Sequence, residues 1–274
     1  MAFVNSHGRN IYYERQGQGP AIVFLHGAGS NGATWWQQLP AFTPHYSCVL
    51  MDIRCFGRSG APVSEFSLSH FVDDLITVLD QESIERAALV GQSLGGMVSL
   101  RTALDHPQRV SAFVSCDSSM AIDHARQLQI VEERLRKVTG MAIEQRSMGR
   151  WFLEHRPAHA ALYAQINHFN PSFHSMASHE WQSAITGLHS QPDALTPMAR
   201  LRELACPTLL LVGREDPIVP VDILEEFKAL IPNSELTVVD NAAHSAYFEQ
   251  PEVFNERVLN FLSRSMSNQR GHNS

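Results

Sequence analysis

The feature that most constrains the fold of this chain is a repeated alternation of short apolar runs with segments of helical periodicity. The apolar runs cover residues 21–27, 46–53, 86–92, 109–117, 208–216 and 235–244. Most are continuous rather than alternating, as expected for strands buried on both faces of a parallel sheet. An apolar stripe at helical spacing marks residues 66–82, 94–105, 222–231 and 252–264. This alternation predicts an α/β fold with a mostly parallel, doubly wound sheet and right-handed crossovers.

The two ends of the chain depart from this pattern. The opening "FVNSHGRNIYYERQG" predicts two strands joined at His7 and Gly8, which form an antiparallel start to the sheet. The closing residues, 265–274, are polar and lack periodicity. We predict that they are disordered.

Between residues 118 and 195 the alternation stops. This segment contains no strand-like run and is rich in His, Met, Arg and aromatic residues, with Pro157, Pro171 and Pro192 as interruptions. Interrupted helices fit it best. Because so long an insertion between strands is usually functional, we predict a helical cap at 118–195. The α/β core then comprises residues 1–117 and 196–264.

The composition limits the classes of function that this chain can have. The chain has 274 residues, 44% of them hydrophobic, and a formal net charge of −7. A chain with this charge lacks the excess of positive charge that attracts nucleic acid, and no apolar run is long enough to span a bilayer. The N-terminus lacks the features of a secretory signal. We therefore expect a cytoplasmic protein that acts on a small molecule, with no nucleic-acid or membrane partner.

The cysteines and histidines give no sign of a metal site. Cys48, Cys55, Cys116 and Cys206 are scattered without metal-type spacing and are predicted to be buried free thiols. His174 and His179 could be offered as metal ligands, but no clustered carboxylate partner supports that interpretation. We expect neither a metal nor another cofactor.

Residues 91–96, "GQSLGG", place Ser93 where a predicted strand ends and a helix begins. A nucleophilic serine needs this strand–turn–helix setting, in which Gly91 and Gly95 let the strand and helix approach closely. The alternative is a serine that only caps the helix. The context favours the nucleophile.

A nucleophilic serine needs a base and an acid that orients the base. His244 follows the last predicted strand, and Asp216 follows the strand before it. Both therefore fall at the same sheet edge as Ser93. Asp117 ends another strand and is a rival for the acid, whereas Glu215 is expected to point elsewhere.

Five segments in the correct order resemble the α/β-hydrolase fold superfamily. They are "HGAGSNGATWW" (26–36), "DIRCFGRS" (52–59), "GQSLGG" (91–96), "VGREDPIVP" (212–220) and "NAAHSAYFEQPEVF" (241–254). The resemblance implies a Ser93–His244–Asp216 catalytic triad. It also implies an oxyanion hole made by the backbone N–H groups of Ala28 and Leu94. Cys55 departs from the family's usual glycine, so the shape of that loop or the pocket wall is expected to differ. We do not expect Cys55 to be catalytic.

Candidate pocket residues come from two regions. His26 and Trp35 lie in segment 26–36, and the predicted cap adds further aromatic and histidine side chains. These are Trp151, His155, His168, Phe169, His174 and Trp181. The alternative for each is a cap core or a solvated face. Arg146 and Arg150 are candidates for binding an acidic substrate, with a solvated helix face as the simpler interpretation.

The sequence therefore predicts a cofactor-free serine hydrolase of a small or medium ester, thioester or lactone. Within the same fold, the alternatives are a hydrolase of carbon–carbon bonds in ring-cleavage products, a haloperoxidase or perhydrolase, and a cofactor-free oxygenase. Ser245, directly after His244, lowers the case for the carbon–carbon hydrolase, because such enzymes often carry an aromatic residue there. A small-ligand receptor is the non-enzymatic alternative.

Overall fold

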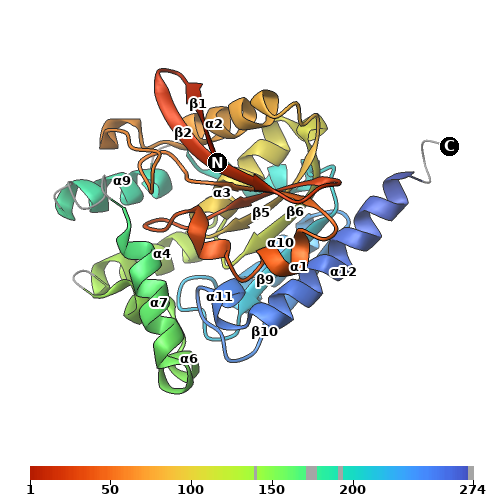
Figure 1. The fold of residues 1–274 in the computed structure, drawn as a ribbon. Helices are drawn as coiled ribbons and strands as arrows, with labels where there is room; N and C mark the ends of the chain where they lie inside the picture. Colours follow the sequence, from red (N-terminus) through yellow and green to blue (C-terminus); the bar gives the residue numbers. More distant parts are fainter. Residues whose placement is uncertain (139–140, 171–177, 191–193, 271–274) are drawn as a thin grey trace.

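The fold is built on an eight-stranded sheet (Figure 1), seen in a computed structural model that describes residues 1–138, 141–170, 178–190 and 194–270. Side chains of residues 178, 179, 181, 182, 190 and 266–270 lie outside the described set. The strand order is β1-β2-β4-β3-β5-β6-β9-β10. In chain order the strands are β1 (Ala2–Ser6), β2 (Arg9–Gln16), β3 (Ala21–Leu25), β4 (Ser47–Met51), β5 (Ala87–Gln92), β6 (Val110–Cys116), β9 (Thr208–Gly213) and β10 (Ser234–Val239).

The six strands from β4 to β10 pair in parallel, as the continuous apolar runs predicted. The predicted antiparallel start is also confirmed, because β1 pairs with β2 through the turn at His7 and Gly8 and β2 pairs antiparallel with β4. Strand order reverses at β3, which pairs with both β4 and β5. Such a reversal opens a crevice at the carboxyl ends of the strands, where ligands bind in open α/β sheets.

Alternate side chains of each buried strand enter two separate cores. Val23 and Leu25 of β3 belong to one apolar cluster, whereas Ile22 and Phe24 belong to the other. Because side chains alternate across a strand, both faces of the sheet are buried in apolar cores. This double burial explains why the strands read as unbroken apolar runs.

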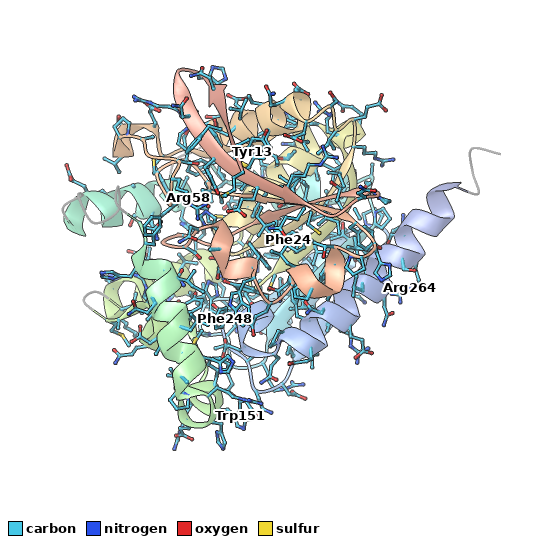
Figure 2. All side chains as sticks on the ribbon, viewed as in Figure 1. Tyr13, Phe24, Arg58, Trp151, Phe248 and Arg264 are labelled. Atoms are coloured by element: carbon cyan, nitrogen blue, oxygen red, sulfur yellow. The ribbon has the colours of Figure 1, made fainter. Side chains whose placement is uncertain are left out.

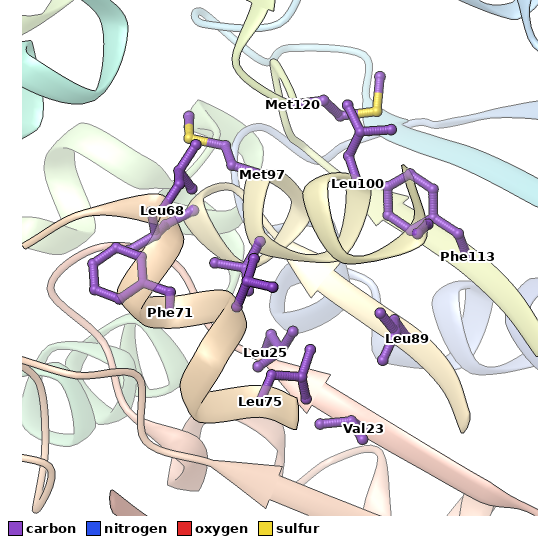
Figure 3. Close-up of a cluster of buried hydrophobic side chains, with 14 of the residues drawn as sticks. Val23, Leu25, Leu68, Phe71, Leu75, Leu89, Met97, Leu100, Phe113 and Met120 are labelled. Carbon is purple, nitrogen blue, oxygen red and sulfur yellow. The ribbon is translucent and has the colours of Figure 1, made fainter. Parts of the chain in front are cut away.

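Two helix layers cover the two faces. The first face packs against α2 (Leu68–Gln81), α3 (Leu94–Asp105) and α10 (Val221–Leu230). Figure 3 shows Phe71 and Leu75 of α2 and Leu100 of α3 beside the strand residues of this core. The second face packs against α1 (Leu39–Phe42) and α12 (Pro251–Arg270). The doubly wound sheet predicted from the sequence is confirmed.

Most of the described residues between 118 and 195 form helices at the carboxyl edge of the sheet. They are α4 (Ala125–Lys137), α5 (Ile143–Ser147), α6 (Arg150–His155), α7 (Pro157–His168) and α9 (Ser178–Ser190). Figure 1 shows these helices gathered on one side of the sheet. One detail corrects the prediction of no strand: β7 (Ile122–Asp123) pairs in parallel with β8 (Thr196–Pro197). This two-residue ladder joins the start and end of the insertion, and it is too short to leave a periodic signal.

The disordered tail is predicted to begin at residue 265, but α12 continues to Arg270, so the predicted start is too early. No glycine or proline follows Pro251 until Gly271, so nothing in the sequence ends the helix sooner. The predicted disorder of residues 271–274 lies outside the described residues. Among the described helices, none combines the length and hydropathy needed to cross a membrane.

Candidate active site

Ser93 occupies a strained turn between β5 and α3. Its backbone angles are φ 48° and ψ −110°, in a region that non-glycine residues rarely enter. The turn is held by neighbouring strands: the Ser93 amide donates to the Cys116 carbonyl at 3.0 Å, and the Gly95 amide donates to the His26 carbonyl at 3.1 Å. The Ser118 hydroxyl also donates to the Ser93 carbonyl at 2.6 Å. Ser93 occupies the N-cap position of α3, but its side chain makes no capping hydrogen bond, so capping does not account for this serine.

The glycines around Ser93 are required by close backbone contact. A Cβ at Gly91 would lie 2.2 Å from the Gly95 carbonyl oxygen, and a Cβ at Gly95 would lie 2.1 Å from the Leu25 carbonyl oxygen. Both distances are far inside van der Waals contact, and both neighbours are backbone atoms. The motif therefore carries its glycines because β3, β5 and α3 pack without room for side chains.

Three side chains from three strand ends form a chain of hydrogen bonds. His244 Nε2 lies 3.0 Å from Ser93 Oγ, and His244 Nδ1 lies 2.9 Å from Asp216 Oδ2. Asp216 Oδ1 also accepts from the amides of Ile218 and Val219, which fixes the carboxylate. A proton on Nδ1 facing Asp216 leaves Nε2 free to accept the serine proton.

The charge environment of His244 favours protonation. Burial by itself lowers the pKa of the imidazole, but the charge of Asp216 and the hydrogen bond to it raise the pKa above its ordinary value. A base of this kind can accept a proton from a serine and hold it as a cation beside the carboxylate.

Asp117, the rival acid, lies behind this chain rather than in it. Its carboxylate accepts from the Gly213 amide and the Ala246 amide, each at 2.8 Å. Burial, followed by the nearby charge of Asp216, raises the pKa of Asp117 to about 7. Asp117 thus fastens the loops that carry Asp216 and His244. Glu215 is exposed, as expected.

Two further groups that the sequence analysis missed hold the His244 loop. Gln92 Nε2 donates to the His244 carbonyl at 2.7 Å. The buried Glu249 carboxylate accepts from the Ala243 and Ser245 amides, and also from the Gly149 amide at the start of α6. Glu249 lies in α11 (Ala246–Glu249), five residues beyond His244. No sequence pattern marks Glu249 as buried, because an acidic residue on a short helix usually faces solvent.

Two backbone amides near Ser93 are available to a ligand. Within the described part of the chain, no hydrogen bond uses the N–H of Ala28 or of Leu94. Leu94 is the first residue of α3, and Ala28 follows the carboxyl end of β3. Both amides therefore lie at the carboxyl edge of the sheet, where the strand order reverses between β3 and β5.

A cavity of about 130 Å³ opens over Ser93. The core and the helical insertion both line it. The core contributes Gly27, Ala28, Ser30, Gln92, Ser93, Met97, Ile218 and His244. The insertion contributes Ser119, Val131, Arg134, Leu135, Val138, Arg146, Ser147, Tyr163, Ile185 and His189.

The predicted pocket residues do not line this cavity where their side chains are described. His26 is fully buried, and its Nε2 accepts from the Ile53 amide at 2.9 Å, so it joins the loops after β3 and β4. Trp35 is fully buried against Phe24, Tyr247 and Phe254 in the second core. Neither residue therefore lines the pocket as predicted, because His26 links two loops by a hydrogen bond and Trp35 packs in the second core.

Among the predicted binding residues of the helical insertion, only Arg146 lines the cavity in the part of the chain that the structure describes. Trp151, labelled in Figure 2, stacks on His155 and packs against the second core, and neither residue lines the cavity. His168 and Phe169 are exposed and do not line it. His174 and the side chains of Trp181 and His179 lie outside the described residues. The side chain of Arg150 is 86% exposed and pairs with Glu154, so it lies on a solvated helix face. Arg146, in contrast, lines the cavity.

No cysteine thiol lines the cavity. All four are free and buried, and burial raises the pKa of Cys55 to about 12. Cys55 adopts φ 74°, the left-handed conformation that favours glycine. Cys55 thus takes a backbone conformation that is ordinary for the family's glycine and strained for a cysteine. In the described ranges, no group of three or more His, Cys, Asp or Glu side chains is placed to hold a metal.

Comparison with known proteins agrees with this architecture. Residues 20–251 match a family model described as the alpha/beta hydrolase fold. A pimeloyl-[acyl-carrier protein] methyl ester esterase of Vibrio vulnificus (strain YJ016) is 28% identical, over 93% of this chain and 99% of its own. A 3-oxoadipate enol-lactonase of Acinetobacter baylyi is 27% identical, over 91% of each chain.

A solved structure agrees as well. An N-acyl homoserine lactone degrading enzyme superposes with a TM-score of 0.80, at 28% identity, and covers 94% of this chain and 99% of its own. These similar proteins are an esterase, a lactonase and a lactone-degrading enzyme.

Proposed function

The chain belongs to the α/β hydrolase fold family, and we propose that it is a cofactor-free serine hydrolase of a small or medium ester, thioester or lactone. The observation that carries the proposal is the hydrogen-bonded chain from Ser93 through His244 to Asp216. The hydrogen-bonded chain begins at Ser93, whose backbone is strained, and a cavity opens over this serine. The esterase and lactonase names of its relatives support the same substrate class.

In this mechanism Ser93 Oγ attacks the substrate carbonyl while His244 Nε2 accepts its proton. Asp216 keeps the imidazole in the required tautomer and stabilises its positive charge. The carbonyl oxygen becomes an oxyanion, which the amides of Ala28 and Leu94 bind. His244 then donates its proton to the leaving alcohol, thiol or ring oxygen, which leaves an acyl group on Ser93.

Deacylation uses the same groups in reverse. His244 accepts a proton from water as the water attacks the acyl-enzyme, and then returns the proton to Ser93 Oγ. We propose that residues 118–195 act as a cap in this cycle. Their helices form one wall of the cavity and so select the acyl or alcohol group that fits there.

The test is covalent labelling with a fluorophosphonate, together with hydrolysis of short p-nitrophenyl esters. We expect Ser93 to be labelled, and Ser93→Ala to abolish both labelling and turnover. Ser119→Ala is a matched control, since Ser119 also lines the cavity but has no bond to His244, and it should still be labelled. Full turnover of a substrate by Ser93→Ala would contradict the proposal and favour the oxygenase alternative. Tight binding of a small molecule without turnover would favour the receptor.

A further inference from the structure

The charge of the cavity is opposite to that of the chain. The chain has a formal net charge of −7, yet the described residues that line the cavity include Arg134 and Arg146 and no Asp, Glu or Lys. An acidic protein thus presents a cationic cavity wall directly over Ser93. Both arginines come from the helical insertion, on α4 and α5.

These two arginines differ from their neighbours in lacking a carboxylate. On the same insertion, Arg126 pairs with Asp222, Arg136 with Glu132 and Arg150 with Glu154. No ion pair within 4.0 Å joins Arg134 or Arg146 to a carboxylate of the described chain. Arg134 Nη2 donates to the Arg146 carbonyl at 2.6 Å, and Arg134 Nε is buried with no described partner.

The two guanidinium groups also repel each other. Burial lowers the pKa of both, and the charge of Asp216 offsets only part of this for Arg134. The charge of Arg134 lowers the pKa of Arg146 further. Arginine stays protonated in proteins, so this cost is not relieved by loss of a proton. An anion placed between them would relieve it and would satisfy the unpaired N–H groups.

Two other polar atoms of the cavity lack partners within the described structure. They are Ser30 Oγ and His189 Nε2. His189 Nδ1 lies 3.0 Å from the Ile185 carbonyl and must donate to it, so Nε2 remains as an acceptor. Buried polar groups are normally satisfied, which indicates that the cavity is built to receive a polar molecule.

We propose that Arg134 and Arg146 bind a carboxylate of the substrate, so that this site hydrolyses anionic esters or lactones in preference to neutral ones. The inference rests on the proposed function, because it places the anion in the cavity where Ser93 attacks. Suitable substrates are half-esters of dicarboxylic acids, lactones that carry a carboxylate, and esters whose alcohol carries one.

The kinetic test compares substrates that differ only in charge. One pair is mono-p-nitrophenyl adipate and its methyl ester, with the carboxylate on the acyl side. The other is 5-acetoxypentanoate and its methyl ester, with the carboxylate on the alcohol side. We expect wild-type kcat/KM to favour the anion in at least one pair. In Arg146→Gln and in Arg134→Gln, the anion-to-ester ratio should fall by about 10- to 100-fold.

The ratio is internally controlled, because a partly unfolded variant loses activity on both members of a pair equally. Arg136→Gln is the matched control, an exposed arginine of α4 that should leave the ratio unchanged. Arg146→Lys should keep part of the preference, since it retains the charge. No preference for the anion in either pair, or equal ratios in the wild type and the glutamine variants, would overturn the inference.

A binding measurement separates this inference from the proposed function. Calorimetry on Ser93→Ala, with adipate and with dimethyl adipate, requires no turnover. We expect adipate to bind more tightly, and to lose about 10-fold or more in affinity when Arg146→Gln is added. Equal binding of the two ligands would overturn the anion site. Preferential adipate binding with no ester hydrolysis by the wild type would keep the anion site and reject the hydrolase.

Discussion

At the scale of single residues, Asp216 and Asp117 occupy neighbouring positions with different contacts. Asp216 bonds to His244, whereas Asp117 bonds to the amides of Gly213 and Ala246. We therefore expect Asp216→Asn to lower kcat/KM by about 10⁴-fold, because the imidazole loses its tautomer control. Asp117→Asn should cost far less activity.

The measurement is kcat/KM on a p-nitrophenyl ester, with the folded fraction of each variant checked by circular dichroism. Asp117→Asn is expected to act on stability, by about 1–3 kcal/mol, since it disturbs buried amide contacts. If Asp117→Asn were the more damaging variant in catalysis, the acid would have to be reassigned to it.

The contrast between these residues and the pocket shows what the sequence can reveal. Ser93, Asp216 and His244 were predicted to be neighbours because parallel strands end at one edge of a sheet. His26, Trp35, Trp151 and His155 were chosen by residue type and segment, and none lines the cavity. Which face of a helix meets a cavity depends on how the insertion packs, and that information is not local.

At the scale of elements, a buried ion pair joins the loop after β4 to α2. Arg54, 1% exposed, donates through Nε and Nη2 to both oxygens of the fully buried Asp74. Nη2 also donates to the Ser6 carbonyl of β1, and Nη1 donates to Glu65. One side chain thus connects an edge strand, a loop and a helix.

We expect Arg54→Met to destabilise the protein by about 3–5 kcal/mol, because it leaves the Asp74 carboxylate buried without a partner. Urea denaturation measures the change. The double variant Arg54→Met/Asp74→Leu should recover much of the loss, since no uncompensated charge remains. Arg9→Gln is the control: Arg9 pairs with Glu65 at the surface and should cost less than about 1 kcal/mol. A cost below 1 kcal/mol for Arg54→Met would contradict this role.

The elements themselves were largely predictable. Each predicted core strand and helix exists, with ends displaced by a few residues, since apolar periodicity records burial rather than hydrogen bonding. The β7–β8 ladder and the last turns of α12 escaped prediction. The first is too short to show a period, and the sequence of the second lacks the apolar periodicity that predicts a helix.

At the scale of the whole molecule, two buried carboxyl groups hold the site to the rest of the fold. Asp117 fastens the loops after β9 and β10, and Glu249 fastens the His244 loop to the start of α6. Burial raises the pKa of Asp117 from 3.8 to about 7 and that of Glu249 from 4.5 to about 8. The hydrogen bonds of Glu249 that join the core to the insertion therefore depend on whether the Glu249 carboxyl is protonated.

A raised pKa means that the folded state binds these protons more tightly than the unfolded state. The stability that the two groups contribute is full below about pH 4 and is lost as the pH rises toward 7 and 8. Each group lowers the free energy of unfolding by up to about 1.4 kcal/mol per pH unit within its range. We expect Glu249→Gln to flatten this decline between pH 5 and 8, because the amide does not titrate. Urea denaturation across that range measures it, with the exposed Glu225→Gln as control. A decline just as steep in Glu249→Gln as in the wild type would show that Glu249 does not take up its proton on folding.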